Sequence, residues 1–324
     1  MKQIVNEQNV NETIVSFVIP HMGREEMLIE TLQSIQNQDF DLNKIEVYVV
    51  TKNSHLQESV HSFAKVYRLN CVYVSQDKNI SMQRNIGAEN IEGQYIAFLD
   101  ADVSLANNWL QAMLKKLREN RKIKLVSAIQ KNSANAPPLE KLRTALSNAH
   151  VDCEVTFLPG RNLLLEKSTF HKSGGFPEHL ETCEDYVFTH TISKQGILFY
   201  SADSHYVHIG EDKAFRPMAE KEVWRGLSNI ASIRGRKIPL SEWPSFIVPP
   251  LFTLGVVCAL LFTVFSHYTL AILSVLGAVT LLCLYSFRLA SLTKGDPSIA
   301  TVFKFYSVYF PARTWGTIKG LMQK

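Results

Sequence analysis

Short apolar runs alternate with stretches of helical period over the first hundred residues. In one such stretch Leu28, Leu32 and Ile35 recur at i, i+4 and i+7, which places them on one face of a helix. The runs that predict strands are residues 13–19, closed by Pro20, and then 45–50, 71–74, 95–99 and 125–129. This alternation predicts βαβ units built around a mostly parallel, Rossmann-like sheet.

A longer apolar block of a different kind follows later in the chain. Residues 246–265 and 268–287 are two runs of 20 residues without a charge, and only Ser266 and His267 separate them. About 20 helical residues span a ~30 Å hydrocarbon core. A buried helical hairpin of a soluble protein is the alternative, but a small domain has little room for so much uncharged sequence. The block therefore predicts a two-helix transmembrane hairpin.

Basic residues flank this block on both outer sides, and the connecting turn carries none. They are Arg234, Arg236 and Lys237 before the block and Arg288 and Lys294 after it. Beyond Pro297 the tail mixes apolar and aromatic residues with a few basic ones, which suits an interfacial helix and also a short third membrane segment. Because Lys and Arg are enriched in cytoplasmic segments, both termini are expected in the cytoplasm, with the chain attached to the cytoplasmic membrane.

Composition excludes several other classes of protein. The 34 basic and 30 acidic residues give a formal net charge of +4, which does not indicate a nucleic-acid-binding protein. The five cysteines form no CxxC pair, so neither a disulfide framework nor a zinc site is indicated. The first 12 residues are polar and lack an apolar h-region, so we do not expect a cleaved secretory signal.

Two carboxylates follow the predicted strand at residues 95–99. Ligands collect at the carboxyl ends of the strands in a parallel sheet, and Asp100 and Asp102 lie at such an end. Oxygen ligands of this kind suit Mg²⁺ or Mn²⁺, which would neutralise the diphosphate of a nucleotide sugar. By itself the Asp-Ala-Asp pattern is weak, because two acids after a strand are also typical of a solvated loop.

A second acidic pair, Glu184 and Asp185, precedes a predicted helix over residues 186–194. An inverting glycosyl transfer needs a carboxylate that takes the proton of the acceptor hydroxyl. The alternative is structural, since acidic residues in a first helical turn interact favourably with the helix dipole. Taken alone, the pair favours that structural interpretation.

Together these segments resemble a family 2 glycosyltransferase of the GT-A fold, over about residues 15–210. The matching segments occur in the order of the family: Ser16–Pro20, Thr31–Ile35 with Gln38, Arg84–Gly87, Tyr95–Asp102, Gly174–Phe176 and Glu184–Asp185. The resemblance implies a nucleotide-sugar donor, a metal bound around Asp102, and Asp185 as the base with Glu184 beside it. It also places His208 near the diphosphate or the metal, although a lone histidine is more often structural.

The resemblance assigns further residues to donor and acceptor. The donor-binding candidates are Pro20, His21, Glu25, Lys52, Asn53, Arg84 and Asp100. Trp224 and Arg225 lie in a segment that resembles an acceptor-proximal helix of membrane-attached members, and an ordinary amphipathic helix at the membrane surface is the alternative.

The largest departure from the family pattern is at residues 51–54. The family usually has Asp-Asp-Gly-Ser there, and this chain has Thr-Lys-Asn-Ser, so the acidic contact to the nucleotide base is missing. Lys52 or Asn53 could hydrogen-bond a base instead, and a UDP-sugar is our hypothesis for the donor. His21 also replaces the usual Asn after Pro20, and Asn79 stands where Gly is common.

We therefore predict a polar tail over residues 1–12, a GT-A catalytic domain over 13–210, an interfacial connector over 211–245, a transmembrane hairpin over 246–287, and a cytoplasmic or interfacial tail over 288–324. The predicted function is metal-dependent, inverting sugar transfer to a membrane-proximal acceptor, such as a lipid-linked glycan in cell-surface polysaccharide or glycolipid synthesis. A non-catalytic membrane scaffold is one alternative. A nucleotidyltransferase is another, although the Gly-rich phosphate loop that it needs is lacking.

Overall fold

A computed structural model describes residues 13–234, 238, 240 and 242–322, so the predicted tail over residues 1–12 and the basic residues Arg236 and Lys237 lie outside the described residues. The chain forms two compact units. The first contains the described residues up to Lys131, with His150–Glu178 and Asp185–Gly210. The second contains Asn132–Ala149, His179–Glu184 and the residues from Glu211 onward. The units therefore interleave along the chain, and residues 132–149 and 179–184 of the predicted catalytic domain belong to the second unit.

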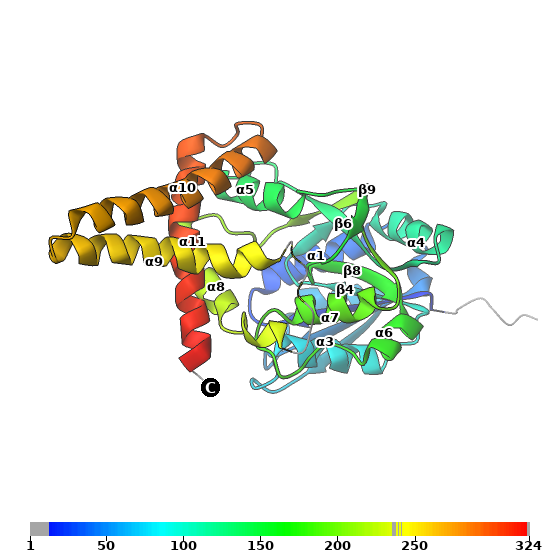
Figure 1. Cartoon of the computed structure of the whole chain (residues 1–324). Coiled ribbons are helices and arrows are strands. Elements are labelled where there is room, and N and C mark those ends of the chain that lie inside the picture. The colour runs from blue at the N-terminus through cyan, green and yellow to red at the C-terminus, as the bar shows by residue number, and fades with distance from the viewer. Residues whose placement is uncertain (1–12, 235–237, 239, 241, 323–324) are drawn as a thin grey trace, which may run out of the picture. The chain divides into compact units, whose positions relative to one another are not determined.

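The first unit is built on a mixed sheet of nine strands (Figure 1). Its order is β3-β2-β1-β4-β8-β6-β9-β5, and β7 pairs with β9. The strands are β1 (Val15–His21), β2 (Ile45–Thr51), β3 (Arg68–Tyr73), β4 (Tyr95–Leu99), β5 (Val103–Leu105), β6 (Ile123–Lys131), β7 (Cys153–Val155), β8 (Asn162–Glu166) and β9 (Ile197–His208). The strand β1 pairs in parallel with both β2 and β4, and β2 pairs in parallel with β3, which confirms the predicted βαβ units. The strand β8 is antiparallel to β4.

Helices cover both faces of this sheet, as a buried parallel sheet requires. Leu28 and Leu32 of α1 and Trp109 of α4 pack on one face. On the other face Ala88 of α3, Phe170 of α6 and Phe188 of α7 pack around Phe98. The helices are α1 (Glu25–Gln36), α2 (Glu58–His61), α3 (Ile80–Glu89), α4 (Trp109–Glu119), α6 (Lys167–Ser173) and α7 (Glu184–Ser193), with short 3₁₀ turns at Leu42–Lys44 and Ser62–Lys65.

The second unit is helical. Its helices are α5 (Pro138–Ser147), α8 (Phe215–Gly226), α9 (Trp243–Val264), α10 (Tyr268–Leu292) and α11 (Ile299–Met322), with a 3₁₀ turn at Ala231–Ile233. Leu142 of α5, Met218 of α8 and Phe305 of α11 share one buried apolar cluster. This packing gives residues 132–149 a place in the second unit, although they lie within the predicted catalytic domain.

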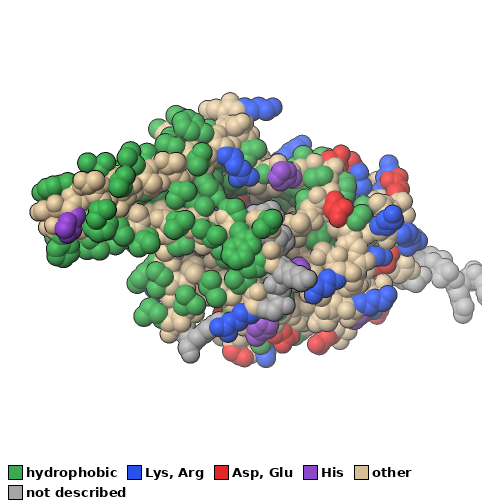
Figure 2. Space-filling model, in the orientation of Figure 1, with side chains coloured by type: hydrophobic (Ala, Val, Ile, Leu, Met, Phe, Trp, Pro, Cys, Tyr) green, Lys and Arg blue, Asp and Glu red, His purple; other side chains and the backbone are tan. Residues whose placement is uncertain are grey.

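The helices α9 and α10 form the predicted apolar hairpin. Both are long and apolar enough to cross a membrane, with a mean hydropathy of 2.3 in their most apolar windows. Only 17% of each window is buried. Hydrophobic side chains consequently cover the projecting part of the hairpin in Figure 2. In a water-soluble protein such a large apolar surface would be covered, which favours contact with lipid.

The helices α8 and α11 approach each other closely because glycines line their contact. A Cβ added at Gly316 would lie 2.1 Å from the Val223 carbonyl oxygen, and one at Gly320 would lie 1.9 Å from that of Leu227. A Cβ at Gly226 would lie 2.8 Å from the backbone of Gly316. No other residue fits at this distance, so the three glycines fix the spacing of the pair.

Candidate active site

Asp100 follows the last residue of β4, at the carboxyl edge of the parallel strands. Its Oδ1 accepts a hydrogen bond from Arg84 Nη2 at 2.9 Å, and the Arg84 side chain is only 2% exposed. The Arg84 guanidinium also lies 4.9 Å from the centre of the Phe176 ring. The structure therefore brings together Arg84 and Asp100, two of the predicted donor-binding residues. A buried arginine orients this carboxylate.

Asp102 lies beside His208, the histidine that the sequence singled out. Pairing of β5 with β9 sets Val103 opposite His208, and His208 Nε2 is 3.2 Å from Asp102 Oδ1. Arg24 Nη2 lies 3.2 Å from the other carboxylate oxygen, Oδ2. A Cβ at Gly210 would lie 2.0 Å from that same oxygen, so a larger residue there would displace the Asp102 carboxylate. Asp102 and His208 thus form one polar group at the carboxyl edge.

These side chains offer a partial set of ligands for a hard cation. Among the described residues, no group of three or more His, Cys, Asp and Glu side chains is arranged to hold a metal ion. Asp102 supplies carboxylate oxygens, His208 supplies a ring nitrogen, and Asp100 is paired with Arg84. A metal held here would need its other ligands from a bound diphosphate or water, which is compatible with Mg²⁺ or Mn²⁺.

The backbone of Gly160 forms hydrogen bonds with both Asp185 and Arg84. The Gly160 amide donates to Asp185 Oδ2 at 3.3 Å, and the Gly160 carbonyl accepts from Arg84 Nη2 at 3.3 Å. Tyr186, the next residue of α7, stacks on Phe157 with 3.9 Å between ring centres. Gly160 therefore connects Asp185 to the pair formed by Arg84 and Asp100. Glu184 is buried and is part of the second unit.

Three of the predicted donor-binding residues line one cavity of about 680 Å³ at the ends of β1, β2 and β3. Asn53 Oδ1 accepts from the Gly23 amide at 2.8 Å, and Asn53 Nδ2 donates to Glu25 Oε1 at 3.1 Å. Lys52 lines the same cavity. Tyr73, 47% exposed at the end of β3, lines it too and was not predicted. The only feature of the sequence that could have indicated Tyr73 is its position as an aromatic residue at the end of a strand.

His21, in contrast, is a buried link between two strands. It is 3% exposed, and its Nδ1 lies 2.9 Å from Thr51 Oγ1 of β2. Burial lowers the pKa of the His21 imidazole below its ordinary value. The neighbouring Pro20 lies within β1, opposite Val50. These two residues shape the strand ends on which the cavity is built.

In the second unit, Arg225 belongs to a buried cluster of charges. Glu222 accepts hydrogen bonds from Arg143, Arg225 and Arg313, and Asp212 lies 3.0 Å from Arg143. Burial alone would raise the pKa of Glu222, but the charges of the three arginines outweigh burial and hold that pKa well below its usual range. Trp224 beside them is 50% exposed. Arg225 thus has a structural role that the sequence did not reveal.

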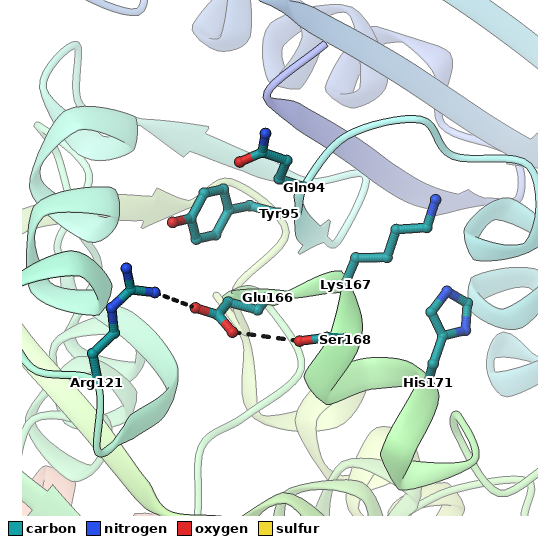
Figure 3. Close-up of a pocket in the computed structure, with 7 residues that line it drawn as sticks. All are labelled: Gln94, Tyr95, Arg121, Glu166, Lys167, Ser168 and His171. Carbon is teal, nitrogen blue, oxygen red and sulfur yellow. Dashed lines mark hydrogen bonds and ion pairs between the residues drawn. The ribbon is translucent and has the colours of Figure 1, made fainter. Parts of the chain in front are cut away.

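A second cavity, of about 550 Å³, lies near the start of β4 (Figure 3). Arg121 Nη1 lies 3.2 Å from Glu166 Oε1, and the Ser168 hydroxyl contacts the other oxygen of that carboxylate. Lys167 Nζ donates to the Ile91 carbonyl at 2.6 Å. None of the side chains that line this cavity belongs to the predicted site. Asp100 follows the opposite end of β4, so the cavity and the predicted site lie at different edges of the sheet.

A mixed sheet with helices on both faces is the architecture of the GT-A glycosyltransferases. Residues 16–176 match the family model "Glycosyl transferase family 2". The chain belongs to this family, which confirms the resemblance found in the sequence and the prediction of an enzyme.

Two curated relatives are named as glycosyltransferases. An uncharacterized glycosyltransferase of Rickettsia bellii is 25% identical over 253 residues, which cover 76% of this chain and 36% of that protein. A poly(ribitol-phosphate) beta-glucosyltransferase of Bacillus spizizenii is 24% identical over 203 residues, which cover 60% of this chain and 32% of that protein. The chain thus spans about a third of the length of these curated relatives.

Among solved structures, the mannosyltransferase PcManGT from Pyrobaculum calidifontis, in complex with GDP-Man and Mn²⁺, has the same fold. It superposes with a TM-score of 0.64 and 16% identity, over 96% of this chain and 87% of that chain. This similarity confirms the GT-A fold.

Proposed function

We propose that the chain transfers a sugar from a nucleotide-sugar donor to an acceptor at the cytoplasmic membrane, with inversion at the anomeric carbon. One observation carries the proposal: Asp102 with His208, and Asp185 with Gly160, Arg84 and Asp100, occur in one unit at the carboxyl edge of its sheet. Ligands of such sheets bind at this edge. The acidic pairs are weak signals separately, and their shared placement supports one site.

The donor nucleotide would occupy the cavity lined by Glu25, Lys52 and Asn53. The base could stack on Tyr73, and Lys52 could donate to a carbonyl of the base. UDP is our first hypothesis for the nucleotide. GDP is the second, because the Pyrobaculum neighbour was solved with GDP-Man.

Asp102 and His208 would hold a divalent metal together with the diphosphate. The metal would supply charge neutralisation for the departing nucleoside diphosphate. Arg24, which is 59% exposed and contacts Asp102, can turn toward phosphate oxygens when the donor binds. Arg84 and Asp100 would hold the strand end in place beneath the donor.

Asp185 would act as the base. The acceptor hydroxyl oxygen forms a bond to the anomeric carbon, the bond from that carbon to the phosphate oxygen breaks, and the hydroxyl proton passes to the Asp185 carboxylate. The hydrogen bond from the Gly160 amide orients that carboxylate. Glu184 precedes it in the chain and would contribute on the acceptor side.

The acceptor is proposed to be a lipid-linked or membrane-proximal glycan. The apolar surface of α9 and α10 supports insertion into a membrane, and Trp224 and Arg225 lie in the same unit as this hairpin. The Bacillus relative acts on poly(ribitol-phosphate), a polymer, which supports a role in the synthesis of a cell-surface polysaccharide.

The proposal is tested by donor hydrolysis with the full chain in detergent. We expect slow, Mn²⁺-dependent release of nucleoside diphosphate from one member of a panel of UDP- and GDP-sugars. Asp102→Ala should abolish the Mn²⁺ dependence, and Asp185→Ala should lower transfer to an acceptor by about 10²–10⁴-fold. Asp203→Ala, at an exposed carboxylate of β9, is the matched control. Undiminished turnover in both site variants would refute the mechanism.

A further inference from the structure

The apolar hairpin crosses α11 partway along its length. Thr253 Oγ1 of α9 lies 3.1 Å from Thr314 Oγ1 of α11, and the Phe252 and Phe310 rings are 5.3 Å apart. In Figure 1 α9 continues beyond this crossing to the turn that leads into α10. Beyond this crossing α9 continues from Thr253 to its end at Val264, and α10 begins at Tyr268 and passes Tyr285, whose ring lies 5.4 Å from that of Phe310. At ~1.5 Å per residue the hairpin with its turn therefore reaches about 20–25 Å beyond α11.

The helix α11 has the character of a helix at a membrane surface. On its inner side Arg313 donates to the buried Glu222 at 2.5 Å. Its C-terminal half exposes Trp315, Ile318 and Leu321, and Lys319 lies 5.6 Å from the Trp315 ring centre. Such a mixture of aromatic, aliphatic and basic side chains is typical of the headgroup region, and the charges keep the helix out of the hydrocarbon.

The turn of the hairpin carries no charged residue and hydrogen-bonds part of its backbone internally, while two exposed polar side chains, Ser266 and His267, lie at its tip. The amides of Phe265, Ser266 and His267 donate to carbonyls of α9 at 3.0, 3.1 and 2.7 Å. The flanking Val264 and Tyr268 are exposed, at 76% and 61%. No charged residue occurs between residues 246 and 287. In hydrocarbon every backbone N–H needs an internal partner, and these three have one.

From these three observations we infer that the hairpin is re-entrant: α9 and α10 enter and leave the same leaflet, and α11 lies at its headgroups. With α11 at the surface, a reach of about 20–25 Å is shorter than the ~30 Å hydrocarbon core. The turn therefore ends inside the bilayer, and the partner of this surface is a lipid leaflet. The inference rests on the membrane attachment in the proposed function. It changes only how deeply the hairpin enters the bilayer, because the sequence alone predicted a hairpin that crosses it completely.

Cysteine accessibility in membranes tests the inference. Ser266→Cys reports on the turn and Ser59→Cys, exposed in the first unit, reports on the cytoplasm. The unmodified chain gives the background from its five cysteines. A membrane-impermeant maleimide is applied to intact bacterial cells that express each form and to inside-out vesicles, and each sample is then solubilised in detergent and labelled again.

We expect Ser266→Cys to stay at background from both sides and to react after solubilisation, whereas Ser59→Cys reacts in inside-out vesicles only. Reaction of Ser266→Cys in intact cells would overturn the inference, because the hairpin then crosses the bilayer. Reaction of Ser266→Cys in inside-out vesicles would also overturn it, because the turn then lies in the cytoplasm. Sedimentation after an alkaline carbonate wash tests attachment itself, so failure of the proposed membrane function is distinguishable from failure of the re-entrant geometry.

Discussion

The buried carboxylate of Glu222 contributes to the stability of the second unit. It is fully buried and is shared by three arginines, of which Arg143 is 11% exposed. Replacing Glu222 by Gln would remove the one carboxylate that all three arginines share in this low-dielectric environment. The nearby Asp212 would remain as a counter-charge for Arg143 and Arg225. We expect Glu222→Gln to destabilise the second unit by about 3–5 kcal/mol, measured as a loss of thermal stability in detergent.

The matched control for this variant lies on the same helix. Glu220 is 69% exposed and pairs with Arg216 at i, i−4, so Glu220→Gln should change stability by less than about 0.5 kcal/mol. Equal losses in the two variants would contradict the assigned role of Glu222.

His21 should make the stability of the first unit depend on pH. Burial lowers its pKa in the folded chain, so the unfolded chain binds a proton more readily. The stability contributed by neutral His21 is complete above the unfolded pKa of about 6.5 and is lost as the pH falls toward the lower folded pKa. We therefore expect the melting temperature to fall between pH 7 and 5, and to fall less in His21→Asn. His55→Asn, at an exposed site, should keep the wild-type slope, and an unchanged slope in His21→Asn would contradict the prediction.

Local sequence was sufficient for Asp100 and Asp102, because a buried apolar strand followed by acids places both at the edge of the sheet. It was insufficient for their partners. Arg24 precedes α1 and reaches Asp102 only because the strand order sets β1 beside β4. The role of His21 could not be predicted either, since its link to Thr51 depends on the register of two strands.

The pairing of α8 with α11 depends on glycine at one crossing. A Cβ at Gly316 would meet the Val223 carbonyl at 2.1 Å, and helical backbones cannot yield locally. We expect Gly316→Ala to separate the helices and to destabilise the second unit by about 1–3 kcal/mol, measured by thermal unfolding in detergent.

Gly277 of α10 is the control for this prediction, because nothing lies within 4 Å of its added Cβ. Gly277→Ala should be neutral or slightly stabilising, since alanine favours helices by about 1 kcal/mol over glycine. Equal destabilisation by both substitutions would contradict the role of the crossing.

Periodicity identified the elements that have strong local patterns and misplaced the others. The strand predicted at residues 71–74 begins three residues earlier as β3, because an edge strand is only partly buried and its pattern is weak. Leu56, Val60, Phe63 and Tyr67 recur at helical spacing and are buried, but only Val60 lies on the short α2 and only Phe63 on the 3₁₀ turn that follows it. The strand β9 carries polar residues at its centre, and its pairing with β6 and β5 defines it.

For the whole molecule, the two units should separate donor binding from acceptor binding. Tyr73 lines the cavity of the first unit, and Trp224 is exposed on α8 of the second. We expect Tyr73→Ala to weaken nucleotide binding roughly 5- to 100-fold, the loss of about 1–3 kcal/mol of base stacking, and to leave the KM for the acceptor unchanged.

Trp224→Ala should do the reverse: raise the KM for the acceptor and leave nucleotide affinity unchanged. Calorimetry with UDP and GDP, and initial rates with a lipid-linked acceptor, measure the two effects. Loss of nucleotide binding in Trp224→Ala would contradict this division of labour.

Local sequence patterns were enough to identify the family, the βαβ core, the carboxylates at the strand end and the apolar hairpin, since each depends on residues close together in the chain. Tertiary structure decided which side chains meet. It joined His208 to Asp102, Asp185 to Arg84 through Gly160, and Glu222 of α8 to Arg143 of α5 and Arg313 of α11. It also set how far the hairpin extends past α11. The physical reason is range: hydrophobic periodicity acts within a segment, whereas contacts between distant segments depend on strand order, register and helix spacing, which a local pattern does not encode.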